Sequence, residues 1–273
     1  MIEIRSKDNA RFKLWLSLQR TAQGRDPDQV LVEGLRFCQD VLISGLLPDQ
    51  IIVSETACRQ PAIQALADSL PERTERFLIS DDLMRRLSQT RQPQGVMLVV
   101  PAPPMSAAQV VPDRQGLYLI ADQVQDPGNL GSMIRTADAF GFSALLLTVG
   151  TVSPLNDKVL RASMGSVFHI PLYRFADLDA VSQWLQCARI PILAADLAGE
   201  SSLAGSWQAP AALLIGNEAR GLSEQARRLA DRLIHVPMPG RAESLNAAAA
   251  AAILCYELMR RRDRAQPQQE DQT

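Results

Sequence analysis

Short, continuously apolar runs alternate along this chain with longer stretches in which apolar residues recur at the spacing of a helix. Residues 117–121 and 211–215 contain only apolar side chains, as expected for strands that are buried on both faces of a sheet. Residues 178–188 show the apolar period of an amphipathic helix. The regular alternation of the two patterns predicts an α/β fold.

A proline-rich segment divides this pattern into two parts. Residues 101–116 contain four prolines and have no hydrophobic period, which is typical of a linker. Residues 1–100 are expected to form a small α/β domain, with strands at 30–32, 50–53, 77–79 and 95–100 and helices at 35–44, 61–70 and 81–87. The polar loop at 88–94 is either a substrate loop or a plain connection.

Residues 117–264 are expected to form the second and larger domain. Its strands are predicted at 117–121, 144–149, 191–195, 211–215 and 233–236. Its helices are predicted after a turn at 126–129, and at 153–165, 178–188, 224–230 and 247–259. Because strands and helices alternate, we expect the sheet of this domain to be parallel and covered on both faces. The polar residues 265–273 are expected to form a disordered tail.

The last strand and helix of the second domain are joined by an unusual segment. Pro237, Pro239 and Gly240 break the strand and predict a stiff turn. Ser244 and Asn246 follow, and both residue types are favoured at the start of a helix. The helix then begins with six alanines, whose small side chains let another backbone come close. Taken alone, the segment is an ordinary connection between a strand and a helix.

Three loops of unusual composition, at 122–135, 216–222 and 237–246, each follow a predicted strand of the second domain. In parallel sheets, ligands bind where loops leave the carboxyl ends of the strands. Three such loops at one edge indicate a nucleotide-like ligand. The first strand is not followed by a Gly-x-Gly-x-x-Gly pattern, and a Walker lysine is missing, so a dinucleotide-dependent oxidoreductase and an ATP site are both disfavoured.

Charge changes the interpretation of the N-terminus. The net charge of −2 excludes a strongly basic nucleic-acid-binding protein. Residues 1–25, however, contain six basic and two acidic side chains, interleaved with apolar residues. This pattern predicts an amphipathic helix with a basic side, and Lys7, Arg11 and Lys13 are then candidates for contact with RNA phosphates. A solvated helix face is an equally good interpretation.

The remaining composition excludes several classes of protein. The four cysteines and two histidines lack metal-ligand spacing, so we expect no metal and reduced structural thiols. The N-terminus lacks the apolar core of a signal peptide, and the longest apolar run, 247–256, is too short to span a bilayer. We therefore expect a soluble, cytoplasmic protein without membrane contact.

The three loops together resemble the three motifs of the SpoU (TrmH) family of RNA ribose 2′-O-methyltransferases. They carry Asn129-Leu-Gly-Ser-Met-Ile-Arg135-Thr-Ala, then Ile215-Gly216-Asn217-Glu218-Ala-Arg-Gly221-Leu222, then Val236-Pro237-Met238-Pro-Gly240 followed by Ser244-Leu245-Asn246. The resemblance covers residues 117–260. Residues 1–100 more loosely resemble the substrate-binding domain of ribosomal-RNA members, through Ser6-Lys7-Asp8-Asn9 and Val32-Glu33-Gly34-Leu35-Arg36. This second resemblance adds Arg36 to the candidate RNA-binding residues.

The resemblance implies a fold, a cofactor and a set of site residues. The fold is a parallel-sheet SPOUT domain with a deep trefoil knot, and the protein is a homodimer that packs through the knotted domain. The cofactor is S-adenosylmethionine, and the positions that hold it are Gly216, Val236, Met238 and Leu245. The positions near the reaction are Asn129, Arg135, Glu218, Ser244 and Asn246. The implied substrate is structured RNA, with ribosomal RNA preferred over transfer RNA; a catalytically silent RNA-binding member is the remaining alternative.

The implied roles leave several choices open. The family proposal makes Arg135 the base that deprotonates the ribose hydroxyl, but a guanidinium is very hard to deprotonate. Arg135 can instead clamp a phosphate and stabilise the developing alkoxide. Glu218 either orients Arg135 or caps a helix, and Ser244 and Asn246 either contact the substrate or cap the last helix.

Two departures from the family pattern weaken particular contacts. Ala247-Ala248-Ala249 stands where members often have Val-Ser-Val, which removes a hydroxyl group. Asp196 follows the strand at 191–195, where a Ser or Thr is expected.

Overall fold

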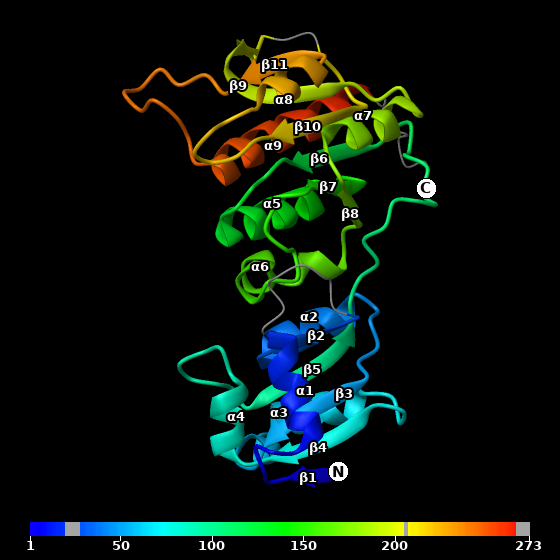
Figure 1. Cartoon of the computed structure of the whole chain (residues 1–273), viewed down its shortest axis with the longest axis vertical. Coiled ribbons are helices and arrows are strands. Elements are labelled where there is room, and N and C mark those ends of the chain that lie inside the picture. Colours follow the sequence, from blue (N-terminus) through cyan, green and yellow to red (C-terminus); the bar gives the residue numbers. More distant parts are fainter. Residues whose placement is uncertain (20–27, 205–206, 266–273) are drawn as a thin grey trace, which may run out of the picture. The chain divides into compact units, whose positions relative to one another are not determined.

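The structure is a computed structural model that describes residues 1–19, 28–204 and 207–265 (Figure 1). Two of the basic residues near the N-terminus, Arg20 and Arg25, and residues 266–273 of the predicted tail lie outside these residues. Contacts within the chain define two compact units, one of residues 1–103 with 155–168 and one of residues 104–154 with 169–273.

The first unit contains a mixed five-stranded sheet with the order β1-β4-β3-β5-β2. The strands are β1 (Ile2–Ile4), β2 (Gln29–Glu33), β3 (Gln50–Ser54), β4 (Glu75–Ile79) and β5 (Val96–Pro101). β1, β4 and β3 are parallel, whereas β5 is antiparallel to both β3 and β2. The helices are α1 (Ala10–Gln19), α2 (Leu35–Ile43), α3 (Pro61–Ser69), α4 (Asp81–Leu87) and α6 (Asp157–Ser163), with short 3-10 turns at Ala57–Arg59 and Ser166–Phe168.

The second unit contains a six-stranded sheet in which every pairing is parallel, with the order β11-β9-β10-β6-β7-β8. The strands are β6 (Leu117–Ala121), β7 (Ala144–Thr148), β8 (Leu172–Phe175), β9 (Ile192–Ser201), β10 (Ala211–Ile215) and β11 (Arg232–His235). The helices are α5 (Pro127–Ala139), α7 (Leu178–Gln186), α8 (Glu224–Leu229) and α9 (Ala247–Ala265). The predicted parallel sheet is therefore confirmed.

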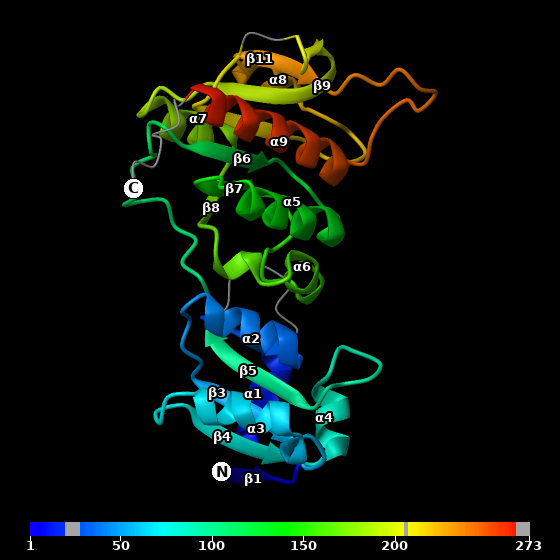
Figure 2. The same cartoon turned by 180° about the vertical axis from the view of Figure 1, so that it is seen from behind.

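Helices cover both faces of this second sheet, as its apolar strands predict. α5 and α9 pack against each other and against β6 and β10 on one face (Figures 1 and 2). α7 and α8 cover the other face, where Val181, Leu185 and Ala226 are buried against Tyr118 and Ile120. Because both faces are covered, the strands in the middle of the sheet have no polar side and read as continuous apolar runs.

The connectivity of the second sheet positions the candidate site. β6 is the first strand of this sheet along the chain, and it lies between β7 on one side and β10 on the other. The direction of winding therefore reverses beside β6, and such a switch point is where α/β sheets bind ligands. The loops that follow β6 and β10 start side by side at this point.

Two strands were not predicted from the sequence, and both lie at an edge. β1 has three residues, of which two are exposed. β8 contains the exposed Arg174 between partly buried aromatic residues, so it lacks a continuous apolar run. An edge strand keeps one side and part of a face in water, which removes the hydrophobic signal that identifies a central strand.

Within the described ranges, no helix is long and apolar enough to cross a membrane. In the same part of the chain, histidine, cysteine and carboxylate side chains do not form a group of three or more that could hold a metal ion.

Candidate active site

The first loop leads directly into helix α5. The side chain of Asp126 accepts a hydrogen bond from the backbone N–H of Asn129 (2.8 Å), and Pro127 occupies the first helical position. An Asp cap followed by Pro is a strong helix start, so the helix begins within the segment that we predicted as a turn at 126–129. Asn129 lies in the first turn and is buried, whereas Arg135 lies further along and is exposed.

The second loop is a tight turn that requires glycine. A Cβ atom on Gly216 would lie 2.5 Å from the carbonyl oxygen of Gly221, which is too close for any side chain. The N–H of Gly221 donates to the carbonyl of Asn217 (2.8 Å), and Gly221 has a φ of 66°. The Asn217 amide donates to the carbonyl of Gln123 (2.8 Å), so the second loop is bonded directly to the first.

The carboxylate of Glu218 binds the segment that precedes α5. It accepts hydrogen bonds from the backbone N–H groups of Gln125 (3.1 Å) and Asp126 (3.0 Å) and from the side-chain amide of Asn129 (3.1 Å). Burial alone would raise the pKa of Glu218, but these hydrogen bonds outweigh it and lower the pKa below its usual value. Glu218 therefore stays ionised, and it contacts the start of α5 rather than Arg135.

The third loop joins the same network through Asn246. The Asn246 amide donates to Oδ1 of Asn129 (2.9 Å), while its own Oδ1 accepts from the backbone N–H groups of Ala248 (2.9 Å) and Ala249 (3.2 Å). Asn246 therefore caps α9, and Ser244 does not. Glu218, Asn129 and Asn246 form one continuous hydrogen-bond chain that links all three loops; we call it the Glu218–Asn246 chain.

The direction of every bond in the Glu218–Asn246 chain is determined. Backbone N–H groups can only donate, so the oxygen of Asn246 must face α9 and its NH₂ group must face Asn129. Asn129 must then accept through its oxygen and donate through its NH₂ group to Glu218. An ionised carboxylate, which only accepts, is the group that completes this order.

A cavity of about 520 Å³ opens between the second and third loops at the carboxyl edge of the sheet. Its lining includes all four residues predicted to hold the cofactor, Gly216, Val236, Met238 and Leu245, and two residues predicted near the reaction, Glu218 and Ser244. Asn129 and Asn246 reach the cavity only through their hydrogen bonds to one another and to Glu218.

Arg135 stands apart from this cavity. It does not belong to the lining residues, and it lies on the exposed side of α5. Throughout the described chain, no side chain or backbone group forms a hydrogen bond or ion pair with its guanidinium. Arg135 is therefore free to contact an anionic ligand.

Among the lining residues that were not predicted as site residues, three have ionisable side chains. Asp196 and Arg227 form an ion pair in the cavity wall, and Asp196 also accepts from the N–H of Ala198 (2.9 Å). His235 lines the cavity with Nδ1 placed 2.9 Å from the carbonyl oxygen of Gly199. Asp196, on β9, was noticed in the sequence only as a departure from the family, and nothing in the sequence pairs it with a residue on α8.

The candidate RNA-binding residues of the first unit differ in their availability. Arg11 is held by the carboxylate of Glu75, at 2.5 and 2.9 Å, and Lys13 lies 3.5 Å from Asp8. Lys7 and Arg36 are exposed and have no partner in the described part of the protein. The apolar side of the predicted helix is confirmed, because Phe12 and Trp15 are buried.

Comparison with known proteins supports the motif resemblance over both parts of the chain. The profile of the SpoU rRNA Methylase family matches residues 116–256, and that of the MRM3-like substrate binding domain matches residues 9–98. The 23S rRNA (guanosine(2553)-2′-O)-methyltransferase RlmP of Bacillus subtilis is 32% identical over 262 residues, which are 94% of this chain and 99% of that protein.

Two solved structures share the architecture over nearly their whole length. The SpoU methyltransferase AviRb from Streptomyces viridochromogenes, in complex with the cofactor AdoMet, is 30% identical with a TM-score of 0.83, covering 93% of this chain and 98% of that one. The AdoMet-bound rRNA methyltransferase from Sinorhizobium meliloti is 30% identical with a TM-score of 0.80, covering 94% of this chain and 97% of that one.

Proposed function

This chain belongs to the SpoU rRNA methylase family, and we propose that it transfers a methyl group from S-adenosylmethionine to a ribose 2′-hydroxyl of ribosomal RNA. The family, inferred from the three loops, and the α/β fold class, inferred from the alternation of strands and helices, are thereby confirmed. The trefoil knot follows from membership of the family. We further propose that residues 1–100 bind the substrate RNA and that residues 117–264 carry the reaction.

The cavity between the second and third loops is the observation that carries this proposal. Its volume of about 520 Å³ lies within the range of about 300–1,000 Å³ that is usual for small-molecule sites. Leu222 and Leu254 offer apolar surface to an aromatic base, and the backbone at Gly216, Val236 and Leu245 offers N–H and C=O groups. When bound, S-adenosylmethionine supplies a methyl group on a positively charged sulfur, which is a strong electrophile.

Glu218, Asn129 and Asn246 are positioning residues in this proposal. Both oxygens of Glu218 are occupied by donors and its pKa is lowered, so it is a poor general base near neutral pH. The chain of hydrogen bonds instead fixes the start of α5 against the loops that surround the cavity. Such alignment accelerates the reaction because methyl transfer requires an in-line approach of the ribose oxygen to the methyl carbon.

Arg135 is the residue that we propose to act on the substrate. In the transfer, the ribose hydroxyl would release its proton to solvent water, and negative charge would develop on its oxygen until that oxygen bonds to the methyl carbon and the bond from that carbon to sulfur breaks, the electron pair staying on sulfur. The positively charged guanidinium of Arg135 stabilises this charge and the neighbouring phosphate electrostatically. Its exposure and its lack of a protein partner among the described residues support this role.

We also propose that the protein is a cytoplasmic homodimer that packs through the knotted unit. Ile253 and Tyr256 on α9 are 44% and 50% exposed, and adjacent apolar side chains on one helix face are typical of an interface. The cytoplasmic location is supported by the similarity to a bacterial enzyme that methylates ribosomal RNA. Sedimentation equilibrium should give a dimer, and Ile253→Glu should shift it to monomer; a monomeric wild type would contradict the dimer.

A methyl-transfer assay tests the function. The protein is incubated with labelled S-adenosylmethionine and with ribosomal or transfer RNA from cells of the source organism that lack the gene. We expect a 2′-O-methylated nucleoside in ribosomal RNA, identified by mass spectrometry. A base-methylated product, or labelling of transfer RNA alone, would contradict the proposal. Arg135→Ala should abolish transfer and leave the affinity for S-adenosylmethionine nearly unchanged.

A further inference from the structure

The loop at 88–94 in the first unit is fixed at its base by the carboxylate of Glu33, the last residue of β2. Glu33 accepts hydrogen bonds from the Ser88 hydroxyl, from the N–H of Gln89 (3.0 Å) and from the Thr90 hydroxyl (2.8 Å). A loop that serves only as a connection does not need one carboxyl group to accept hydrogen bonds from three of its donors. Because hydrogen bonds to Glu33 fix its base, we infer that the loop holds its outer residues in a fixed position.

The other end of the loop is bonded to the first turn of α2. The side-chain oxygen of Gln94 accepts from the N–H of Leu35 (2.7 Å), the first residue of the helix. A backbone N–H can only donate, so the oxygen of Gln94 is committed and its NH₂ group points elsewhere. Throughout the described chain, nothing accepts a hydrogen bond from that NH₂ group, and Gln94 lines a cavity.

This cavity has a volume of about 320 Å³ and lies between the loop and α2. The ring of Phe37 lines it, and so do the side chains of Arg36, Asp40 and Gln92, for which the described residues contain no polar partner. Arg161 lines it as well, but its guanidinium is already bonded to Asp157 (2.9 Å). The cavity therefore combines one aromatic ring, several free donors and one free carboxylate.

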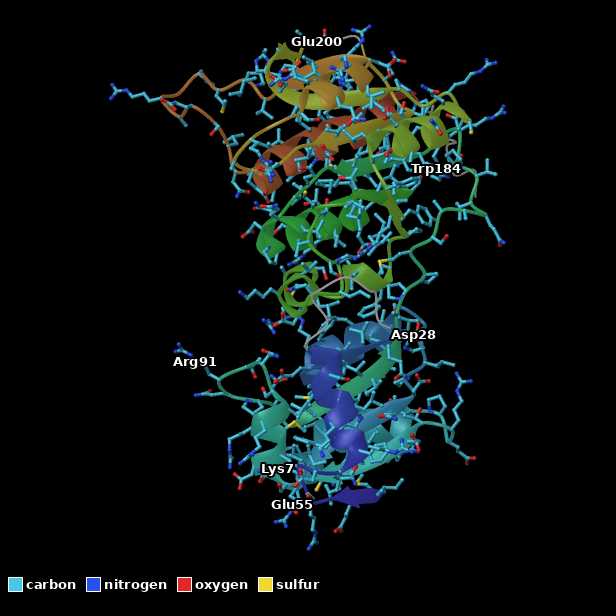
Figure 3. All side chains as sticks on the ribbon, in the orientation of Figure 1. Lys7, Asp28, Glu55, Arg91, Trp184 and Glu200 are labelled. Atoms are coloured by element: carbon cyan, nitrogen blue, oxygen red, sulfur yellow. The ribbon has the colours of Figure 1, made fainter. Side chains whose placement is uncertain are left out.

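This combination matches a nucleobase better than a phosphate. A base offers a flat face for Phe37 and an edge that carries both donors and acceptors, and RNA is read in this way where nucleotides are unpaired. The carboxylate of Asp40 would accept from a base N–H but would repel a phosphate. Arg91, outside the cavity at the tip of the loop, projects into solvent without a partner among the described residues, as Figure 3 shows, and suits the adjoining phosphate.

We propose that the cavity between α2 and the loop at 88–94 binds one unpaired nucleotide of the ribosomal RNA, separate from the nucleotide that is methylated. This inference rests on the proposed function, and it assigns to the first unit a definite mode of RNA recognition. Phe37 stacks on the base, Arg36 and Gln94 read its edge, and Arg91 holds its phosphate.

Binding measurements on the full-length protein test the proposal. The probe is ribosomal RNA from cells that lack the gene, and affinity is measured by filter binding at several salt concentrations. Phe37→Leu should weaken binding about ten-fold, since it removes one base–aromatic stack, while Phe37→Tyr should restore it. Arg36→Gln should weaken binding about five-fold or more. Arg91→Gln should reduce the steepness of the plot of log affinity against log salt concentration by about one unit, as expected for the loss of one phosphate contact.

Matched controls separate this role from effects on folding and from the proposed function. Arg73, exposed in another turn of the first unit and outside the cavity, provides the control variant Arg73→Gln, which should bind as the wild type does. All variants should keep the wild-type affinity for S-adenosylmethionine. A wild type that neither binds S-adenosylmethionine nor methylates RNA would refute the proposed function itself.

Three results would overturn the nucleotide pocket alone. The first is an active wild type whose affinity for ribosomal RNA is unchanged, within about two-fold, in Phe37→Leu and Arg36→Gln. The second is equal weakening by Phe37→Tyr and Phe37→Leu, which would make the effect structural. The third is tight binding of a free nucleoside monophosphate that these variants abolish without changing RNA binding, which would assign the cavity to a soluble nucleotide.

Discussion

Replacing Asn246 with Asp changes the direction of hydrogen bonding in the Glu218–Asn246 chain while keeping the cap of α9. The carboxylate of Asp still accepts from Ala248 and Ala249, and a negative charge at a helix N-terminus is favourable. It has no donor for Oδ1 of Asn129, which is buried. Two outcomes are then possible for Asn129. Its Oδ1 can stay in place and face the carboxylate of the new Asp side chain, or its amide group can rotate, which breaks its hydrogen bond to Glu218.

The size of the effect follows from these bonds. A buried acceptor without a partner costs roughly 1–3 kcal/mol, and the exposure of Asn246 places the loss at the lower end of that range. Asn246→Ala loses the same bond and also the cap, which adds about 1 kcal/mol. We therefore expect Asn246→Ala to be the less stable variant, although both variants misplace the start of α5. A shift of about 1 Å at a reacting centre lowers a rate on the order of 100-fold.

Single-turnover methyl transfer, with thermal unfolding measured in parallel, separates the two effects. Both variants at Asn246 should transfer the methyl group at least about ten times more slowly than the wild type. Asp177→Ala is the control, because Asp177 caps α7 through the N–H of Ala180 (2.8 Å) and lies outside the candidate site. The Asp177→Ala variant should be destabilised by about the free energy that a helix cap contributes, and it should transfer the methyl group at the wild-type rate. A wild-type rate of methyl transfer in Asn246→Asp would refute the positioning role of the Glu218–Asn246 chain.

Three further predictions concern single residues of the site. Gly216→Ala places a methyl group about 2.5 Å from the carbonyl oxygen of Gly221, so calorimetry should show S-adenosylmethionine binding weakened at least about ten-fold, and an unchanged affinity would contradict the tight turn. The pKa of Glu218 is lowered in the folded state, so its stabilisation is present above the unfolded pKa of about 4.3 and is lost as pH falls through the lower folded pKa. The difference in unfolding free energy between wild type and Glu218→Gln should accordingly be constant from pH 7 to about 5 and shrink at lower pH; a constant difference at all pH values would refute this. Arg135→Lys keeps the charge but loses the planar fork, so transfer should slow while the affinity for S-adenosylmethionine stays the same; equal rates would show that charge alone suffices.

The central strands were predictable from the sequence because burial on both faces leaves a continuous apolar run. β6 and β10 were placed at their observed bounds for this reason. β8 was missed because an edge strand tolerates the exposed Arg174 among its aromatic residues. In the first unit, the positions of β2 to β5 were predictable but strand direction was not, since nothing in the apolar run of β5 distinguishes an antiparallel from a parallel neighbour.

The location of the site was predictable, whereas the partners within it were not. Three loops at the carboxyl edge of one parallel sheet must lie near one another, and that geometry follows from strand order alone. The bonds between the loops join residues far apart in the chain, such as Glu218 with Asn129 and Asn129 with Asn246. Glu218 was expected either to orient Arg135 or to cap a helix, and its actual partners depend on which backbone N–H groups the start of α5 leaves free.

The cations of the first unit show why charge counting does not locate an RNA-binding surface. The excess of basic residues near the N-terminus predicted a basic helix face, yet Arg11 of that helix is bonded to Glu75, which lies 64 residues further along the chain. An arginine in such a pair must give up a carboxylate before it binds a phosphate, so its net contribution to RNA affinity is small. Arg36 belongs to no basic cluster in the sequence, but it has no carboxylate to release among the described residues. Arg36→Gln should therefore weaken RNA binding more than Arg11→Gln does, although the sequence pattern alone favours the reverse order.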